Sequence, residues 1–492
     1  MITSTTTATQ PKTKGQEVAP AVPTGAASQL LTPPGTAAAT GIKPNQVFDI
    51  LRRHLLVDGF PVVVDLDRSH GSWLVDAMTG KQYLDLFMFF ASAPIGFNHP
   101  RMLDANVMAR LARASLMKPS NSDFYTVEMA EFVDTFERLA MPAALPHLFL
   151  ISGGTLGVEN ALKAAFDWKV RKNFARGYRT ERGSKVMHFE QAFHGRSGYT
   201  LSLTNTTDTR KTKYFPKFDW PRVVNPKIAF PIAGKSLDQV IQLEKLAVAQ
   251  MEHAFAEHKD DIAAIIIEPI QGEGGDNHFR SEFFAELRRL ADENEALLIF
   301  DEVQTGVGLT GRMWAYEHFG VTPDFLCFGK KMQICGMLAS KRIDEVPDNV
   351  FAESSRINST WGGSLVDMVR ATEYLKIIHE ERLVDAAATL GQKMLDGFMA
   401  LQKEFPNLMQ NVRGRGLMCA FDLSDVTARD RLLEATFERE LLVLATGPAG
   451  VRFRPSLALT ENELSEGLNR LRDSLEHVRR SRRTPAPAPG TK

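Results

Sequence analysis

The sequence of 492 residues has only three cysteines, and none of them lies in a CxxC pair. Cys327, Cys335 and Cys419 cannot all pair with one another, which argues against a disulfide framework or a zinc ribbon and favours the reducing cytoplasm. We therefore predict no metal site. No run of about 18 apolar residues occurs, so we expect no membrane-spanning helix. The formal net charge is only -1, which excludes a general attraction to nucleic acid or to an acidic membrane.

Both ends of the chain have a composition that does not favour a folded core. Residues 1–42 are rich in Thr, Ala and Pro and lack the apolar stretch of a secretory signal. Their low acid content makes an organellar transit peptide an alternative, but the segment contains no Arg, so we predict a disordered tail. Residues 481–492 are predicted to form a second disordered tail.

Between the tails, apolar strand patterns alternate with amphipathic helical patterns. Helical spacing occurs, for example, at Val158, Leu162, Ala165 and Phe166. The strand candidates are the short apolar runs in PHLFLISGG, SKVMHFEQAF, IAAIIIEP, ALLIFDEV and PDFLCFGKK. This alternation predicts an α/β protein with a mostly parallel central sheet that is covered on both faces.

The same patterns predict how the chain divides into domains. Residues 105–367 carry the alternation and should form a large domain. After about residue 368 a long helical stretch precedes shorter strand and helix candidates, which is typical of a smaller α+β domain. We predict that residues 43–104 and 368–480 form this smaller domain together.

Ligands of an open parallel sheet collect at the carboxyl ends of its strands, and four groups of residues follow strand candidates here. They are Gly153-Gly154-Thr155, Glu268, Asp301 and Lys330. The glycines and the helix after them could present backbone N–H groups and a helix dipole to a phosphate. A tight turn with Thr155 as the helix N-cap is the alternative. The spacing matches neither GxGxxG nor the P-loop motif, which disfavours a dinucleotide-dependent oxidoreductase.

Asp301 and Lys330 have the most specific chemistry among these residues. A carboxylate at the end of an apolar strand needs a partner, which is either a protonated pyridinium nitrogen of a cofactor or a cap or basic side chain of the protein. Lys330 is followed by Lys331, and a pair of lysines is usually a solvated surface feature. The segment FLCFGKKMQICG is otherwise apolar, however, and a lysine in an apolar pocket has a lowered pKa and is nucleophilic.

One aromatic and two basic residues offer further contacts. Phe193 follows the strand candidate KVMHFEQ and either stacks on a planar cofactor or packs in the core. Arg196 and Arg452 are candidates for binding a substrate carboxylate, because a guanidinium holds a carboxylate through two parallel hydrogen bonds.

Several of these segments resemble one known family. SGGTLGVENALKAAFDWK, EPIQGEGGDNHF, IFDEVQTGVGLTGRMW and FGKKMQICG are similar to segments of the class III aminotransferases, which have fold type I and depend on pyridoxal 5'-phosphate (PLP). The resemblance extends over about residues 45–480. FMFFASAPIGFNHP, GEGGDNHF and FGKKMQICG are most similar to the lysine-specific branch of that family.

The resemblance implies a set of cofactor contacts. Lys330 would form the Schiff base with PLP, and Asp301 would pair with the pyridine nitrogen. The other implied cofactor contacts are Phe193 and His194 at the ring, Gln304 at the ring hydroxyl, Gly154 and Thr155 at the phosphate, and Ser359 and Thr360 at the phosphate of the partner subunit. The active unit would therefore be a homodimer.

The resemblance also implies the substrates. L-lysine would donate its terminal amino group to 2-oxoglutarate, which gives 2-aminoadipate 6-semialdehyde and L-glutamate. Arg452 would bind the α-carboxylate of 2-oxoglutarate, and Glu273 would cover Arg452 when the other substrate is present. Asn358 would assist this exchange, and Arg196 would hold the carboxylate of lysine.

Five alternatives stay open at this point. Ornithine, acetylornithine or 4-aminobutyrate would replace lysine as the donor in related aminotransferases. A PLP-dependent aminomutase would need no external keto acid, and a non-catalytic PLP-fold binding protein is the alternative outside enzymes.

Overall fold

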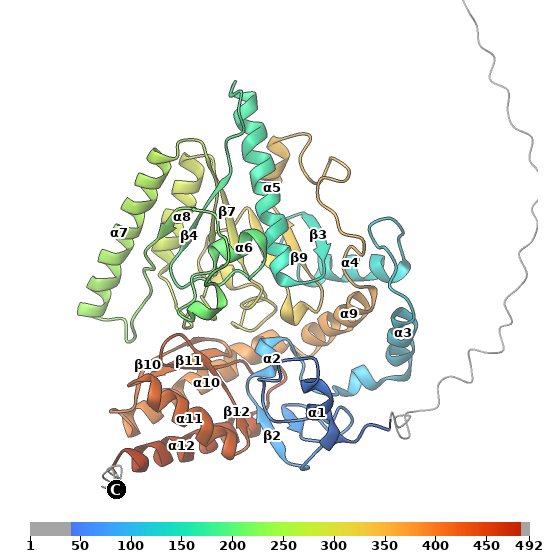
Figure 1. Ribbon diagram of the computed structural model, residues 1–492, viewed down its shortest axis with the longest axis vertical. Helices are drawn as coiled ribbons and strands as arrows, with labels where there is room; N and C mark the ends of the chain where they lie inside the picture. Colours follow the sequence, from blue (N-terminus) through green and yellow to red (C-terminus); the bar gives the residue numbers. More distant parts are fainter. Residues whose placement is uncertain (1–40, 484–492) are drawn as a thin grey trace, which may run out of the picture. The chain divides into compact units, whose positions relative to one another are not determined.

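The computed structural model describes residues 41–483 (Figure 1). The predicted tails, residues 1–42 and 481–492, lie outside the described residues except for residues 41–42 and for 481–483, which complete the last helix. The described chain consists of two compact units. The first ends at Val57 and contains a 3-10 helix, η2 (Pro44–Gln46), and α1 (Val47–Arg52). The second begins at Asp58 and contains every other element named below.

A seven-stranded sheet forms the centre of the second unit. Its order is β3 (His147–Ile151), β9 (Cys335–Ala339), β8 (Phe325–Phe328), β7 (Leu297–Asp301), β6 (Ile262–Ile267), β4 (Lys185–Phe189) and β5 (Arg222–Val223). Neighbouring strands are parallel except at β9, which is antiparallel to both β3 and β8. The predicted α/β fold with a mostly parallel central sheet is confirmed.

Both faces of this sheet are buried because alternate side chains of each strand pack on different helices. Leu297 and Ile299 face the cluster of α5 (Gly154–Ala175), whereas Leu298 and Phe300 face α7 (Lys235–Glu257) and α8 (Ser281–Glu293). Figure 1 shows α7 and α8 beside each other, and the two helices are in contact. Burial on both faces explains why the strands appear in the sequence as continuous apolar runs.

Two smaller sheets accompany the central one. The first has the order β10 (Met409–Arg415), β11 (Met418–Leu423), β14 (Gly450–Phe453) and β13 (Leu444–Thr446), and the second has the order β1 (Trp73–Val75), β2 (Gln82–Asp85) and β12 (Leu441–Leu442). The β2–β12 pair joins residues near the start of this unit to residues near its end. Around these sheets pack α10 (Leu383–Glu404), α11 (Val426–Glu438) and α12 (Glu461–Arg483). The limits of the predicted domains stay a prediction.

The long helical stretch predicted after residue 368 is two helices. α9 (Leu365–Glu380) ends just before Arg382, whose φ of 52° lies in the left-handed region and turns the chain into α10. α3 (Ala105–Ser115) and α4 (Val127–Leu139) pack on α9. The remaining short helices are α2 (Met88–Ala91), α6 (Gly198–Leu203), η3 (Pro100–Leu103), η4 (Thr209–Lys211), η5 (Ala315–His318), η6 (Lys330–Met332) and η7 (Lys341–Glu345). Among residues 41–483, no helix combines the length and the apolar character needed to cross a membrane.

Candidate active site

The carboxyl ends of the central strands surround a cavity of about 220 Å³. Its lining comprises Gly154, Thr155, Phe193, His194, Gly195, Glu268, Asp301, Val303, Gln304 and Lys330. Seven of the residues predicted to bind a cofactor thus meet in one place: Gly154, Thr155, Phe193, His194, Asp301, Gln304 and Lys330. A larger hollow of about 630 Å³ around Asn205 and Trp220 contains none of these seven, so the chemistry and not the volume locates the site.

The turn between β3 and α5 leaves the first backbone amides of the helix free of a side-chain cap. Gly153 has a φ of 109°, which favours glycine, and no side chain caps the helix that begins at Gly154. A Cβ atom on Gly154 would lie 2.7 Å from Cγ1 of Val303, so only glycine fits this close approach. Thr155 therefore does not act as the N-cap, and the uncapped helix N-terminus is suited to an anion such as a phosphate.

Asp301 is positioned by a buried histidine. Oδ2 of Asp301 lies 2.9 Å from Nδ1 of His194, and Oδ1 accepts a hydrogen bond from the N–H of Val303 at 3.1 Å. Nε2 of His194 is buried and has no hydrogen-bond partner among the described residues. The His194 contact orients the carboxylate and leaves it at the wall of the cavity.

The structure separates the two adjacent lysines. Lys331 is buried, and its Nζ donates a hydrogen bond to the backbone carbonyl of Gln304 at 2.6 Å. Lys330 instead lines the cavity. Burial lowers the pKa of Lys330, and the nearby charges of Asp301 and Glu268 partly oppose that shift. The interpretation as a solvated surface pair is therefore wrong for both lysines, and Lys330 is the one suited to act as a nucleophile.

Glu268, which the sequence places at a strand end without a role, supports the wall of the cavity. Its carboxyl group accepts hydrogen bonds from the N–H groups of Phe193 and Gly272, both at 2.9 Å. Burial raises the pKa of Glu268 to about 7, and the charge of Asp301 adds to the shift. Glu268 thereby fixes the backbone of Phe193, whose side chain also lines the cavity.

Arg452 lies near the cavity and has no carboxylate partner within residues 41–483. It belongs to β14 and is buried, and its Nη1 lies 3.5 Å from Oε1 of Gln304. Its guanidinium carbon lies 5.7 Å from the ring centroid of Phe90, and its Nε has no hydrogen-bond partner among the described residues. Burial lowers the pKa of Arg452 to about 10, with the neighbouring Arg454 adding to the shift.

Glu273 and Arg452 do not form an ion pair in this structure. Instead, Oε1 of Glu273 accepts hydrogen bonds from Nζ of Lys211 and from the hydroxyl group of Thr206, the latter at 2.8 Å. The pair predicted from the sequence is therefore open.

Besides Glu273 and Arg452, four more predicted site residues do not line the cavity of their own chain. Arg196, Asn358 and Thr360 are exposed, and Ser359 is half-buried. The backbone carbonyl of Ser359 accepts a hydrogen bond from Ser122, and that of Thr360 accepts one from Ser120.

Arg454 is a residue near the site that the sequence reasoning missed. It is buried, forms two hydrogen bonds with the carboxylate of Asp276, and donates from Nε to Oε1 of Gln304 at 3.0 Å. The only signal in the sequence is the arginine in RFRPSL that follows Arg452 at an interval of two.

Residues 57–475 match the sequence model of the family described as aminotransferase class-III. The chain belongs to this family. The L-lysine-epsilon aminotransferase of Mycobacterium tuberculosis is 51% identical over 436 residues, which cover 88% of this chain and 96% of the relative. The human mitochondrial 4-aminobutyrate aminotransferase is 30% identical over 83% of this chain and 84% of its own. The lysine aminotransferase from M. tuberculosis, solved in the internal aldimine form, has a TM-score of 0.87 and 51% identity, and the match covers 89% of this chain and all of that one.

As a class III aminotransferase, the protein uses PLP as its cofactor, and the cavity fits this group. The uncapped N-terminus of α5 offers free amides to a phosphate. The Asp301 carboxylate offers a partner to a protonated ring nitrogen, and the side chains of Phe193 and Val303 offer apolar surface to a flat ring. Lys330 offers a buried amine of lowered pKa to an aldehyde.

Proposed function

We propose that this enzyme transfers the terminal amino group of L-lysine to 2-oxoglutarate and forms 2-aminoadipate 6-semialdehyde and L-glutamate. The observation that carries the proposal is the 51% identity to an L-lysine-epsilon aminotransferase, compared with 30% to a 4-aminobutyrate aminotransferase over similar lengths. The guanidinium of Arg452 near the cavity supports it, because this group has no carboxylate partner among the described residues and both substrates carry a carboxylate that needs a cationic partner.

The residues of the cavity divide the binding of PLP among them. Gly154 and Thr155 would hold the phosphate through backbone N–H groups, and Gln304 would contact the ring hydroxyl. Asp301, oriented by His194, would hold the proton on the ring nitrogen, while Phe193 would lie against the ring. When bound, PLP supplies an electron sink that stabilises negative charge on the carbon that bears the reacting amine.

Lys330 moves the proton in the reaction. Its Nζ takes the proton from the terminal carbon of lysine, and the lowered pKa of this buried amine favours the neutral form that acts as a base. Asp301 and Glu268 lie close enough to influence the charge of this amine. In the second half of the reaction the same amine returns a proton during the formation of glutamate.

Arginines recognise the carboxylates of the two substrates. Arg452 binds the α-carboxylate of 2-oxoglutarate, and Arg196 holds the carboxylate of lysine. Glu273 covers Arg452 when lysine is bound, with Asn358 assisting the exchange. Glu273 lies close enough to influence the pKa of Arg452, which supports an exchange between the two positions.

Two further proposals concern the assembly and the location of the enzyme. We propose a homodimer in which Ser359 and Thr360 complete the phosphate site of the partner, since neither residue lies at the cavity of its own chain. We also propose a cytoplasmic location, which the three free cysteines support.

A comparison of amino donors tests the proposed reaction. The purified enzyme with PLP is assayed for glutamate formation from 2-oxoglutarate with lysine, ornithine, acetylornithine or 4-aminobutyrate. Lysine should give the highest kcat/KM, and its aldehyde product should appear in equal amount to glutamate. A higher kcat/KM for another donor would contradict the choice of lysine. Turnover of lysine without any keto acid would indicate an aminomutase instead.

A further inference from the structure

Glu273 is held in place by a loop that lies outside the cavity. The contacts come from Thr206 and from Lys211, the last residue of η4, and both bind the same oxygen, Oε1. The Thr206 hydroxyl also accepts a hydrogen bond from the N–H of Asp208 at 3.2 Å, so the loop closes on itself next to Glu273. The ion pair between Lys211 and Glu273 is largely shielded, with side chains 30% and 19% exposed.

The backbone at Glu273 is fixed, so only its side chain can move. Its carbonyl accepts hydrogen bonds from the N–H of Gly447 at 3.2 Å and from the hydroxyl group of Thr446 at 3.4 Å. The glycines on either side are tightly enclosed. A Cβ atom on Gly272 would lie 2.5 Å from the amide group of Gln304, and one on Gly274 would lie 2.0 Å from the carbonyl oxygen of Gln191. A change in the partner of Glu273 must therefore come from rotation of its side chain.

Two cations compete for this carboxylate. Lys211 holds it now, while Arg452 is buried and lacks a carboxylate partner among the described residues. Arg454, which is also buried, is neutralised by Asp276. An unpaired buried cation is costly, so Arg452 binds either the Glu273 side chain or a carboxylate that arrives with a substrate.

We propose that Lys211, assisted by Thr206, is a specificity-determining positioning residue that holds Glu273 away from Arg452 and so keeps Arg452 free for the second carboxylate of a dicarboxylic substrate. This inference rests on the proposed function for the role of Arg452. Without Lys211, the Glu273 carboxylate turns to Arg452 and competes with the incoming dicarboxylate. A monocarboxylic amine donor is not subject to that competition.

Binding of glutarate, a dicarboxylate without a keto group, tests this inference in the holoenzyme. Isothermal titration calorimetry should show that Lys211→Met binds glutarate about tenfold more weakly than wild type, because glutarate must then displace Glu273 from Arg452. Lys211→Arg should restore binding. Lys213→Met is the matched control, since Lys213 is exposed on the same loop and its Nζ lies 4.5 Å from the Tyr214 ring; it should bind glutarate like wild type. In steady state, Lys211→Met should raise the KM for 2-oxoglutarate about tenfold and change kcat about twofold at most.

A double variant shows whether Lys211 acts through Glu273. Glu273→Gln removes the competing charge, so adding Lys211→Met to it should not weaken glutarate binding further. If Lys211→Met weakens glutarate binding equally with and without Glu273→Gln, the inference is overturned, because Lys211 would then act on the anion directly or through the fold. Unchanged glutarate binding in Lys211→Met, or no binding in wild type, would also overturn it. The proposed reaction is tested separately, in the comparison of amino donors. If lysine is not a donor there, the proposed reaction is refuted, but the glutarate measurement is unaffected.

Discussion

At the level of single residues, Lys330 and Lys331 have the same side chain but different surroundings, since Lys330 lines the cavity and Lys331 binds a backbone carbonyl. We predict that Lys330→Ala lowers kcat at least about a thousandfold, because the amine that moves the proton is lost. Lys331→Met loses one hydrogen bond to the carbonyl of Gln304 and should cost about 1–2 kcal/mol of stability while keeping kcat within about tenfold of wild type. Single-turnover kinetics with lysine and urea denaturation measure the two effects. Comparable losses of kcat in the two variants would contradict the assignment of Lys330.

A second prediction at this scale concerns Glu302, which is buried next to the site but faces away from the cavity. Its carboxyl group accepts hydrogen bonds from Thr305 and from the N–H groups of Ala315 and Tyr316. Burial raises the pKa of Glu302 from 4.5 to about 7. A raised folded-state pKa means that this group stabilises the fold below pH 4.5 and that the contribution is lost as the pH rises through 7.

Glu302→Gln removes this pH dependence, because the amide does not ionise. The variant should be less stable than wild type at pH 5, since it lacks one hydrogen-bond acceptor. The difference in the free energy of unfolding between wild type and variant should narrow, by up to about 3 kcal/mol, between pH 5 and pH 8. Equilibrium unfolding in urea at the two pH values measures it. If this difference in the free energy of unfolding stays constant, or widens with pH, the pKa of Glu302 is not raised in the folded state.

At the level of elements, the sequence predicted those strands and helices whose burial follows a regular pattern. The runs that became β3, β4, β6, β7 and β8 are apolar because both faces of the sheet are covered. β9 was not predicted, because its pairing with both β3 and β8 depends on contacts distant in sequence. The turn at α2 could not be predicted from local sequence patterns either. Residues 88–91 all have positive φ, and Asp85 holds the turn through the N–H groups of Phe87 and Met88.

The candidate site was predictable for a related reason. Every residue that follows a parallel strand arrives at the same edge, so Asp301 and Lys330 had to lie close together once the sheet was correct. The partners of side chains were not predictable. Nothing in the sequence indicates that Glu273 binds Lys211 or that His194 orients Asp301. Such contacts depend on loops whose course the tertiary fold determines.

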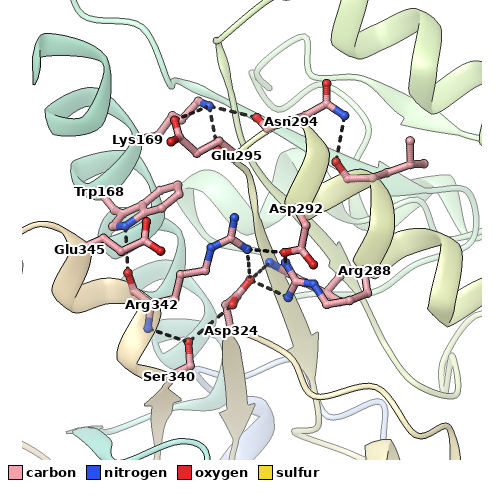
Figure 2. Close-up of polar contacts among 12 residues, drawn as sticks. Trp168, Lys169, Arg288, Asp292, Asn294, Glu295, Asp324, Ser340, Arg342 and Glu345 are labelled. Carbon is pink, nitrogen blue, oxygen red and sulfur yellow. Dashed lines mark hydrogen bonds and ion pairs between the residues drawn. The ribbon is translucent and has the colours of Figure 1, made fainter. Parts of the chain in front are cut away.

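Asp324 illustrates how one side chain joins several elements. It precedes β8 and accepts a hydrogen bond from the N–H of Leu298 in β7 at 2.8 Å. Figure 2 shows the guanidinium groups of Arg288 and Arg342 directed toward it, with nitrogen–oxygen distances of 2.8 and 3.2 Å. The network links α8 and η7 to the amino ends of β7 and β8, whereas the cavity lies at the carboxyl ends of the strands. A buried carboxylate that pairs with two arginines is expected to be costly to lose.

We predict that Asp324→Asn lowers the free energy of unfolding by about 3 kcal/mol, because it leaves two arginines without their shared buried anion. Asp292→Asn is the matched control. Asp292 contacts the same two arginines, but its side chain is 57% exposed, so its loss should cost less than about 1 kcal/mol. Urea denaturation at pH 7 compares the variants. Equal losses would contradict the view that burial of Asp324 decides the strength of the network.

At the level of the whole molecule, the described chain leaves part of its predicted site unassembled. Ser359 and Thr360 lie on a loop whose carbonyls bind Ser122 and Ser120, away from the cavity. Three exposed apolar side chains are close to these residues in the sequence: Phe124 and Tyr125 follow Ser122, and Trp361 follows Thr360. A second copy of the chain would both cover this surface and bring Thr360 to a neighbouring phosphate site.

Mixing two inactive variants tests whether the site is shared. Lys330→Ala removes the reacting amine, and Thr360→Asp places a carboxylate beside the phosphate and should weaken PLP binding by repulsion. In a mixed dimer one site carries both defects and the other carries neither, provided that Thr360 acts across the interface. Co-refolding the two inactive proteins should therefore restore about a quarter of wild-type activity, since about half of randomly paired dimers are mixed and each has one intact site. If Thr360 acted within its own chain, every site would keep one defect, and mixing would restore no activity.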